Sequence, residues 1–294
     1  MKKLFAFTLI VWFCSITGCT KDPIKVLIVT GQNNHKWQAS SVILQKYLNE
    51  SGLFFADIVV SPKKGEDMSG FRPDFSAYKT VVLDYTDFDG DPWPKATNDA
   101  FIDFVKKGGG VVVFHAVASA FPKWKEFNEI IGLGAWGDRN EKDGPYVYFE
   151  DDKEVRDYSP GPAGSHGRQH EFVVTIRDKN HPITKGLPAS WTHAKDELYD
   201  RMRGPAVNMT VLSTAFSDKS TGGSGRHEPA LMVIHWGKGR IFHSILGHIG
   251  PEQTEYPALE CASFRTTFLR GTEWTATGKV TQKIPADFPL TANH

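Results

Sequence analysis

Apolar runs alternate with amphipathic segments along the first half of the chain. Four segments rich in apolar residues are typical of strands buried in a sheet: residues 24–30, 54–60, 80–84 and 111–114. Three segments carry apolar residues at helical spacing: residues 37–48, 98–107 and 121–131. Because strands and helices alternate in this way, the pattern predicts a parallel sheet with helices on both of its faces.

The second half of the chain is less regular. Residues 171–176 alternate between apolar and polar side chains like an edge strand. Three further strands are predicted: residues 211–215, 230–235 and 240–246. The sequence shows no internal repeat. We therefore predict one α/β domain over residues 20–294, with a mostly parallel sheet, long insertions and a C-terminal extension after about residue 275.

The first 19 residues are expected to be a lipoprotein signal peptide. Two lysines precede an apolar stretch at residues 4–13, which is too short to anchor a chain in a bilayer. The segment Ile16-Thr17-Gly18-Cys19 resembles a bacterial lipobox, so cleavage would leave Cys19 as a lipidated N-terminus; a plain secretory signal cut elsewhere is the alternative. Thr20 favours the outer membrane of the bacterial cell envelope, with attachment through acyl chains.

Charge and cysteine content narrow the possible partners. The chain has 34 basic and 34 acidic residues and no long basic run, so nucleic acid is not expected as a partner. With Cys14 in the signal and Cys19 modified, Cys261 has no cysteine to pair with. Its helical, apolar surroundings predict a packed thiol, and a nucleophile is the alternative.

Polar residues follow the predicted strands closely. In open parallel sheets, ligands bind beyond the carboxyl ends of the strands, so these residues are expected to gather at one edge. They are Gln32, Asn34 and His35, then Asp84, Thr86 and Asp87, then His115 and Ser119, and finally His248. We expect the rings of His35, His115 and His248 to lie within roughly 10 Å of each other, about two turns of helix. Each histidine also has a structural reading, as a loop residue, a cap or a core side chain.

Two further segments carry groups with useful chemistry. In THAKDELYDRM, Asp196, Glu197 and Tyr199 could supply a base, a metal ligand or acceptors for sugar hydroxyls. The alternative is a helix start with acidic residues at its favoured end. In GSHGRQHEF, the spacing of His166 and His170 is a weak metal signal, because Gly167 disfavours the helix that would bring both rings together.

Five segments, taken together and in order, resemble the ThuA-like (trehalose utilisation) family: IKVLIVTGQNNHKW, KGGGVVVFHAVASAF, NHPITKGLP, KDELY and EPALMVIHWGKGRIFHSILGH. The resemblance covers about residues 24–270. It implies a flavodoxin-like sheet of the class I glutamine amidotransferase-like superfamily. It also implies a role in the catabolism of trehalose, related disaccharides and their 3-keto derivatives.

The resemblance also places a histidine where amidotransferases carry their nucleophile. In those enzymes the turn after the strand presents a cysteine, whereas this chain has His115-Ala116-Val117 there. Thiol-dependent hydrolysis of glutamine is therefore not expected. Ser119 is a conceivable substitute, but no G-x-S-x-G motif surrounds it.

Two functions from different classes fit these features. The first is an enzyme that cleaves a glycoside or 3-keto-glycoside by hydrolysis or by an elimination (lyase) reaction. Its candidate catalytic residues are His115, Asp196, Glu197 and His248. A divalent metal is a possible cofactor, held by His115, Glu197 and His248. Sugar contacts are expected from His35, Gln32, Asp87, Tyr199 and Trp37, and stacking from Trp93, Trp136 and Trp236. The second function is a non-catalytic sugar-binding lipoprotein that uses the same pocket.

Overall fold

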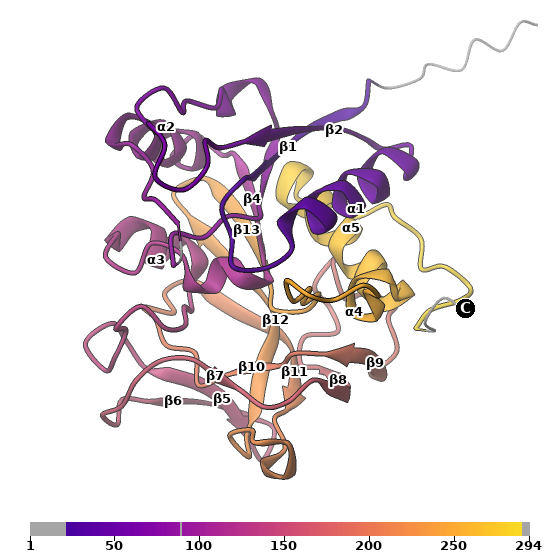
Figure 1. Ribbon diagram of the computed structural model, residues 1–294. Coiled ribbons are helices and arrows are strands. Elements are labelled where there is room, and N and C mark those ends of the chain that lie inside the picture. Colours follow the sequence, from indigo (N-terminus) through magenta and orange to yellow (C-terminus); the bar gives the residue numbers. More distant parts are fainter. Residues whose placement is uncertain (1–21, 89, 290–294) are drawn as a thin grey trace, which may run out of the picture.

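Parallel strands form one half of the central sheet (Figure 1). The computed structural model describes residues 22–88 and 90–289; the predicted signal peptide and Cys19 lie outside them. In these residues, five neighbouring parallel strands run in the order β2-β1-β3-β4-β13. Their bounds are β1 Ile24–Thr30, β2 Phe54–Val60, β3 Thr80–Leu83, β4 Gly110–Phe114 and β13 Gly239–Ser244. This is the strand order of flavodoxin-like folds.

Antiparallel strands extend the same sheet beyond β13 in the order β12-β11-β8-β9. Their bounds are β12 His227–Trp236, β11 Met209–Phe216, β8 His170–Ile176 and β9 Ser190–Asp196. The prediction of a mostly parallel sheet is confirmed for the first half of the chain, and the later strands make the complete sheet mixed. The predicted edge strand at 171–176 is not at the edge, because β8 pairs on both sides; its alternation reflects one partly exposed face.

Short strands fill part of the long insertion after residue 132. The hairpin of β5 Tyr146–Glu150 and β6 Lys153–Asp157 pairs with β12. A separate small ribbon pairs β7 Ser165–His166 with β10 Tyr199–Asp200. The segment around Asp196 is therefore the end of β9 followed by β10, and the alternative helix start is wrong. Strands β7 and β10 are too short to leave a periodic signal in the sequence.

Helices cover both faces of the parallel half, as predicted (Figure 1). Helices α1 Trp37–Glu50 and α5 Ala262–Thr277 contact each other on one face, and α5 also contacts β3, β4 and β13. Helices α2 Lys95–Lys106 and α3 Lys125–Ile131 pack on the other face, and α4 Pro257–Glu260 is a short helix that leads into α5. Helix α3 begins later than predicted because Phe121, with φ of +45°, cannot start a right-handed helix.

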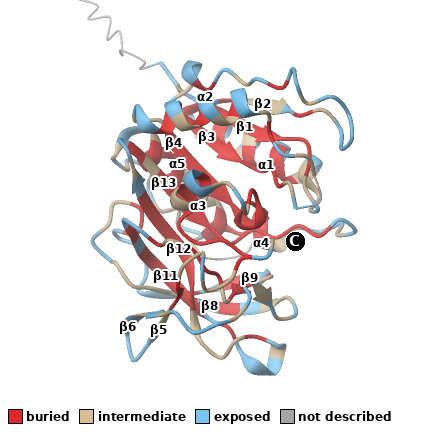
Figure 2. Ribbon diagram, turned by 90° about the vertical axis from the view of Figure 1, so that its left-hand side faces the viewer, coloured by how far each residue is buried: buried red, intermediate tan, exposed pale blue. Residues whose placement is uncertain are grey.

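Strands of both the parallel and the antiparallel half contribute buried apolar residues to the core, which runs through the centre of the molecule (Figure 2). Cys261 is buried between α4 and α5, as its apolar surroundings predicted. Among the described residues, no helix has the length and hydropathy that a membrane span requires.

Candidate functional site

Three histidine rings meet at the carboxyl edge of the parallel strands. His35 follows β1, His115 follows β4 and His248 follows β13. The ring centroids of His35 and His115 are 5.1 Å apart, those of His35 and His248 4.8 Å, and those of His115 and His248 5.2 Å. The expectation that these rings share one end of the sheet is confirmed, and it follows directly from the flavodoxin-like strand order.

The antiparallel half of the sheet adds a carboxylate to the three rings. Glu197 lies between β9 and β10, and its Oε2 is 3.6 Å from Nε2 of His248. Its other oxygen, Oε1, is 3.4 Å from Nδ1 of His166. One potential ligand atom from each of His35, His115, Glu197 and His248 falls within 4.8 Å of the others, so this group has the composition and spacing of a metal site.

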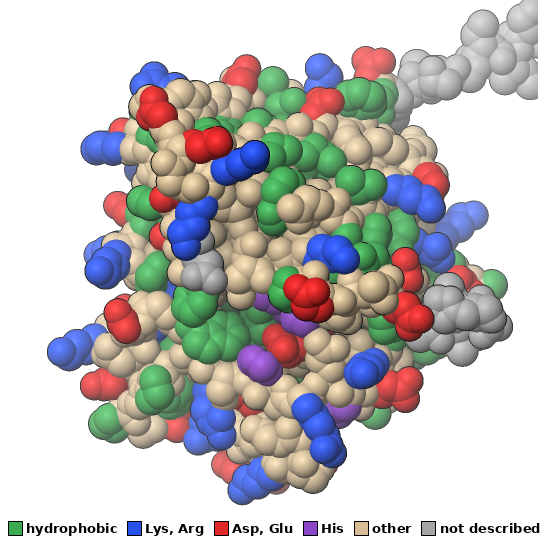
Figure 3. Space-filling model, in the orientation of Figure 1, with side chains coloured by type: hydrophobic (Ala, Val, Ile, Leu, Met, Phe, Trp, Pro, Cys, Tyr) green, Lys and Arg blue, Asp and Glu red, His purple; other side chains and the backbone are tan. Residues whose placement is uncertain are grey.

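His35, Glu197 and His248 line a pocket of about 310 Å³, and His115 is buried next to the two histidines without lining it. Aromatic side chains of Phe88, Trp136 and Tyr199 line it together with Ser119. The Tyr199 ring lies against His115 with centroids 4.2 Å apart, and Trp136 meets Tyr199 edge-on. Histidine side chains reach the surface beside an acidic side chain near the middle of the face drawn in Figure 3. The pocket therefore combines titratable groups with flat apolar surfaces.

A backbone carbonyl fixes the ring of His115. Its Nδ1 lies 2.5 Å from the Ile245 carbonyl oxygen, which can only accept, so the neutral ring carries its proton on Nδ1. Its Nε2 is buried and has no hydrogen-bond partner among the described residues. His115 also has φ of +39°, an unfavourable conformation for a residue with a Cβ. Backbone strain of this kind is concentrated at functional sites.

A chain of polar contacts fixes His35. The buried Asp84 carboxylate accepts from the Asn33 amide (3.0 Å) and from the Ser40 hydroxyl (2.6 Å). The Asn33 amide oxygen is thereby turned toward His35, where it accepts from the backbone N–H at 2.9 Å and lies 3.3 Å from Nδ1. Asn34 offers Nδ1 a second oxygen at 3.1 Å. This leaves Nε2 of the neutral ring with the free lone pair.

Asp196 supports the site from behind the pocket. Its carboxylate accepts from the backbone N–H groups of Glu197 (2.7 Å), Gly247 (2.8 Å) and His248 (3.0 Å). It also lies 2.9 Å from Nε2 of His193, whose other nitrogen is 3.6 Å from the Cys261 thiol. Both oxygens of Asp196 are thus occupied, and the residue holds Glu197 and His248 in place instead of facing the pocket.

Burial sets the protonation of the cluster. It lowers the pKa of His35 to about 3 and that of His115 well below its ordinary value, and in both rings the neighbouring histidines lower it further. Burial also lowers the pKa of His248. For Glu197 it acts in the opposite sense and raises the pKa to about 7. The rings are therefore neutral near pH 7, with their lone pairs available.

Other predicted sugar contacts lie outside this pocket. Gln32 is buried and spans Pro62 and Asp91, so it holds loops together. Trp37 starts α1 and does not line the pocket. Trp93 is buried in an aromatic core cluster, and Trp236 donates to Glu129 beside α3. Phe88 and Pro251 line the pocket and Gln169 contacts His248, but none of the three has a distinctive local pattern by which it could be predicted from the sequence.

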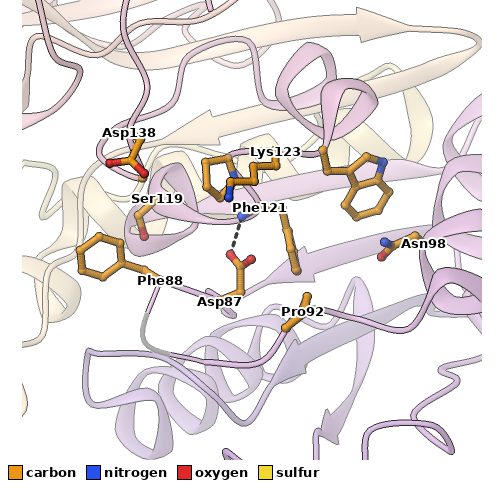
Figure 4. Close-up of a pocket in the computed structure, with 11 residues that line it drawn as sticks. Asp87, Phe88, Pro92, Asn98, Ser119, Phe121, Lys123 and Asp138 are labelled. Carbon is orange, nitrogen blue, oxygen red and sulfur yellow. Dashed lines mark hydrogen bonds between the residues drawn. The ribbon is translucent and has the colours of Figure 1, made fainter.

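A larger pocket of about 670 Å³ adjoins the first and shares Phe88 and Ser119 with it. Asp87 lies on its wall, where its carboxylate accepts from the backbone N–H of Phe121 at 2.5 Å (Figure 4). Lys123 and Asp138 bring opposite charges to the same wall, and Trp124 adds an aromatic face. This pocket contains none of the clustered histidines.

The strand order and the helices on both faces of the parallel half define an α/β protein with a flavodoxin-like, class I glutamine amidotransferase-like fold. The chain matches the family model described as ThuA, trehalose utilisation, over residues 25–275, and it belongs to that family. Membership implies a carbohydrate-related function.

Solved structures agree with this assignment. A ThuA-like protein from Parabacteroides merdae is 57% identical, with a TM-score of 0.87 over 91% of this chain and 95% of its own. A ThuA-like protein from Bacteroides uniformis is 20% identical, with a TM-score of 0.55 over 88% of this chain and 94% of its own, and shows the shared fold. No curated protein matches the chain.

Proposed function

We propose that this protein cleaves a glycoside or 3-keto-glycoside of the trehalose-like disaccharide class, by elimination or hydrolysis. The observation that carries the proposal is the convergence of His35, Glu197 and His248 in a pocket with aromatic walls, next to the buried His115. Aromatic faces suit the apolar faces of sugar rings, and neutral imidazoles and a carboxylate suit their hydroxyl and keto groups. The carbohydrate-related family gives the ligand class.

Cleavage of a 3-keto-glycoside needs only proton transfer. A base takes the proton from the carbon between the ketone and the anomeric carbon. The electron pair of that C–H bond forms a carbon–carbon double bond, the bond from the anomeric carbon to the glycosidic oxygen breaks, and that oxygen takes up a proton. Addition of water to the double bond completes a hydrolysis. No thiol or serine nucleophile is required for any of these steps.

Two groups in the pocket can exchange protons with a bound sugar. Glu197 and His166 lie 3.4 Å apart, and His166 is the more accessible, with 42% of its side chain exposed against 13% for Glu197. Proton transfer by a positioned side chain typically contributes about 10²–10⁴-fold to rate. The pair therefore supplies an acid–base function at the pocket mouth.

His166→Ala should lower turnover by about 10²-fold or more without lowering stability measurably, because the side chain is exposed and only its proton transfer is lost. The measurement is release of reducing sugar from a panel of disaccharides and their 3-keto derivatives, with thermal melting of each variant. His170→Ala is the matched control: this ring belongs to the same segment but lies against the Arg168 carbonyl oxygen and does not line the pocket.

Three outcomes separate the hypotheses. If the wild type turns over a sugar and the His166→Ala variant does so at the same rate, His166 is not part of the acid–base pair. Binding of sugars with no turnover of any panel member would favour the non-catalytic sugar-binding protein. If the folded wild type neither binds nor turns over any sugar of the panel, the carbohydrate proposal at this pocket is refuted.

The larger pocket is the proposed position for the second sugar ring. It shares Phe88 and Ser119 with the histidine pocket, so a disaccharide in one continuous groove would pass between these side chains. Asp87, Lys123 and Asp138 would then offer polar contacts, and Trp124 a stacking surface.

The protein is proposed to be a bacterial lipoprotein of the outer membrane, with Cys19 as the acylated residue. We expect Cys19→Ser to move the protein from the membrane fraction to the soluble fraction, because removal of the acyl chains removes the anchor. The measurement is cell fractionation followed by immunoblotting, with Cys14→Ser as the control within the signal. Equal membrane retention of the Cys19→Ser protein and the wild type would contradict the anchor.

A further inference from the structure

We propose that His35, His115, Glu197 and His248 bind one divalent transition-metal ion through three imidazole Nε2 atoms and one carboxylate. This goes beyond the proposed function, because it can be tested without any sugar. Four features support it: the arrangement of the nitrogens, the hydrogen bonds on the far side of each ring, the kind of donor atoms and the open side of the site.

The first feature is convergence. The four potential ligand atoms lie within 4.8 Å of one another, and Nε2 of His248 is 3.6 Å from Oε2 of Glu197. Ligands of a tetrahedral ion at about 2.1 Å are about 3.4 Å apart, and opposite ligands of an octahedral ion are about 4.2 Å apart. Small shifts of side chains would therefore bring all four atoms to coordination distance.

The second feature is the set of contacts to Nδ1. The Ile245 carbonyl oxygen accepts from Nδ1 of His115, and amide oxygens of Asn33 and Asn34 face Nδ1 of His35. The Gln169 amide lies 2.9 Å from Nδ1 of His248 and can accept from it once its oxygen and nitrogen are exchanged by rotation. Metal-binding histidines characteristically donate their second ring N–H to such an acceptor, which orients the ring.

The buried Nε2 of His115 is a polar atom for which a bound ion would supply a partner. It has no hydrogen-bond partner among the residues that the structure describes. His243 has the same isolated arrangement, with Nδ1 2.8 Å from the Ile131 carbonyl oxygen and Nε2 unpartnered. However, His243 is not part of the four-residue group, so an unpartnered nitrogen alone does not make a site. At His115, two further imidazoles and a carboxylate complete the donor set.

The donor atoms indicate the class of metal. Imidazole nitrogens favour zinc, iron, nickel and copper, whereas magnesium and calcium prefer all-oxygen surroundings. His35, Glu197 and His248 also line the open pocket, so a ligand or water could occupy a further coordination position. Such an ion would polarise a keto oxygen, and with Glu197 held as a ligand, His166 is the side chain left for proton transfer.

The test uses the mature full-length chain with any affinity tag removed, stripped with a chelator and titrated with Zn²⁺ or Co²⁺ in a calorimeter. We expect one equivalent to bind and the melting temperature to rise with metal concentration, because the ion binds only the folded chain. With Co²⁺, visible absorption bands report coordination by nitrogen and oxygen.

Glu197→Gln and His248→Ala should each weaken this binding by at least about 10–100-fold, while His235→Ala, an exposed histidine outside the group, should leave it unchanged. Glu197→Gln keeps the shape of the side chain, so it remains informative if a histidine variant fails to fold. Absence of a tight equivalent in the wild type, or equal affinity in wild type and Glu197→Gln, would overturn the metal site. Neither result bears on whether the pocket binds sugar, and a chain that binds metal but turns over no sugar would refute only the proposed function.

Discussion

Asp196→Ala should lower the free energy of unfolding by about 3–5 kcal/mol, the usual cost of removing one partner from a buried ionic pair. The carboxylate is fully buried and lies 2.9 Å from His193. It also accepts from the backbone N–H groups of Glu197, Gly247 and His248. Burial alone would lower the pKa of His193, but Cys261 and Asp196 raise it, to about 10. Truncation would leave a buried charge and three backbone donors without an acceptor.

Chemical denaturation of the mature chain measures this effect. Asp99→Ala is the matched control, because Asp99 pairs with Lys95 at 2.7 Å but 63% of its side chain is exposed. Its loss should change the unfolding free energy by less than about 0.5–1 kcal/mol. If the two variants lost similar amounts of stability, Asp196 would not support the site in the way its contacts indicate.

His115→Ala should keep the fold and lower turnover by at least about 10–100-fold on whichever panel sugar the wild type cleaves, because one of the four proposed metal ligands is lost. The expected stability cost is about 1–3 kcal/mol, because the buried Ile245 carbonyl oxygen loses its donor. Turnover falls much further because the ring contacts His35, His248 and Tyr199, which line the pocket. Initial rates and denaturation curves of the same preparations give both quantities.

His243→Ala separates the two effects of that substitution. His243 is also fully buried and lies 2.8 Å from a backbone carbonyl oxygen, but it is outside the pocket. It should therefore lose a similar amount of stability and keep its activity. Equal loss of activity in both variants would mean that His115 acts only through the fold.

The parallel half of the fold could be predicted from the sequence because its strands are rich in apolar residues and alternate with amphipathic helices. Once their order is flavodoxin-like, the residues after β1, β4 and β13 must meet at one edge, and this places His35, His115 and His248 together. The sequence resemblance to the ThuA-like family carried the ligand class, which no local pattern could supply.

The antiparallel half was harder to predict. Its strands are half-exposed, and β10 has two residues, so periodicity is too weak to fix their pairing. Glu197 could be grouped with His115 and His248 from the sequence, but the placement of Glu197 between β9 and β10 came only from the structure, as did the role of Asp196 behind the pocket. Gln32 and Asp87 follow the right strands but turn to other loops, because side-chain direction after a strand depends on contacts far away in the sequence.

The four proposed metal ligands come from residues 35, 115, 197 and 248, which span most of the chain. During synthesis these residues leave the ribosome in that order, so His35 waits for most of the polypeptide, and His115 for nearly half of it, before the group can close. The same spacing means that a nascent chain released before residue 248 lacks part of the cluster. The site can therefore assemble only after residue 248 has been synthesised. A chain that ends earlier lacks His248 and cannot form the four-residue group.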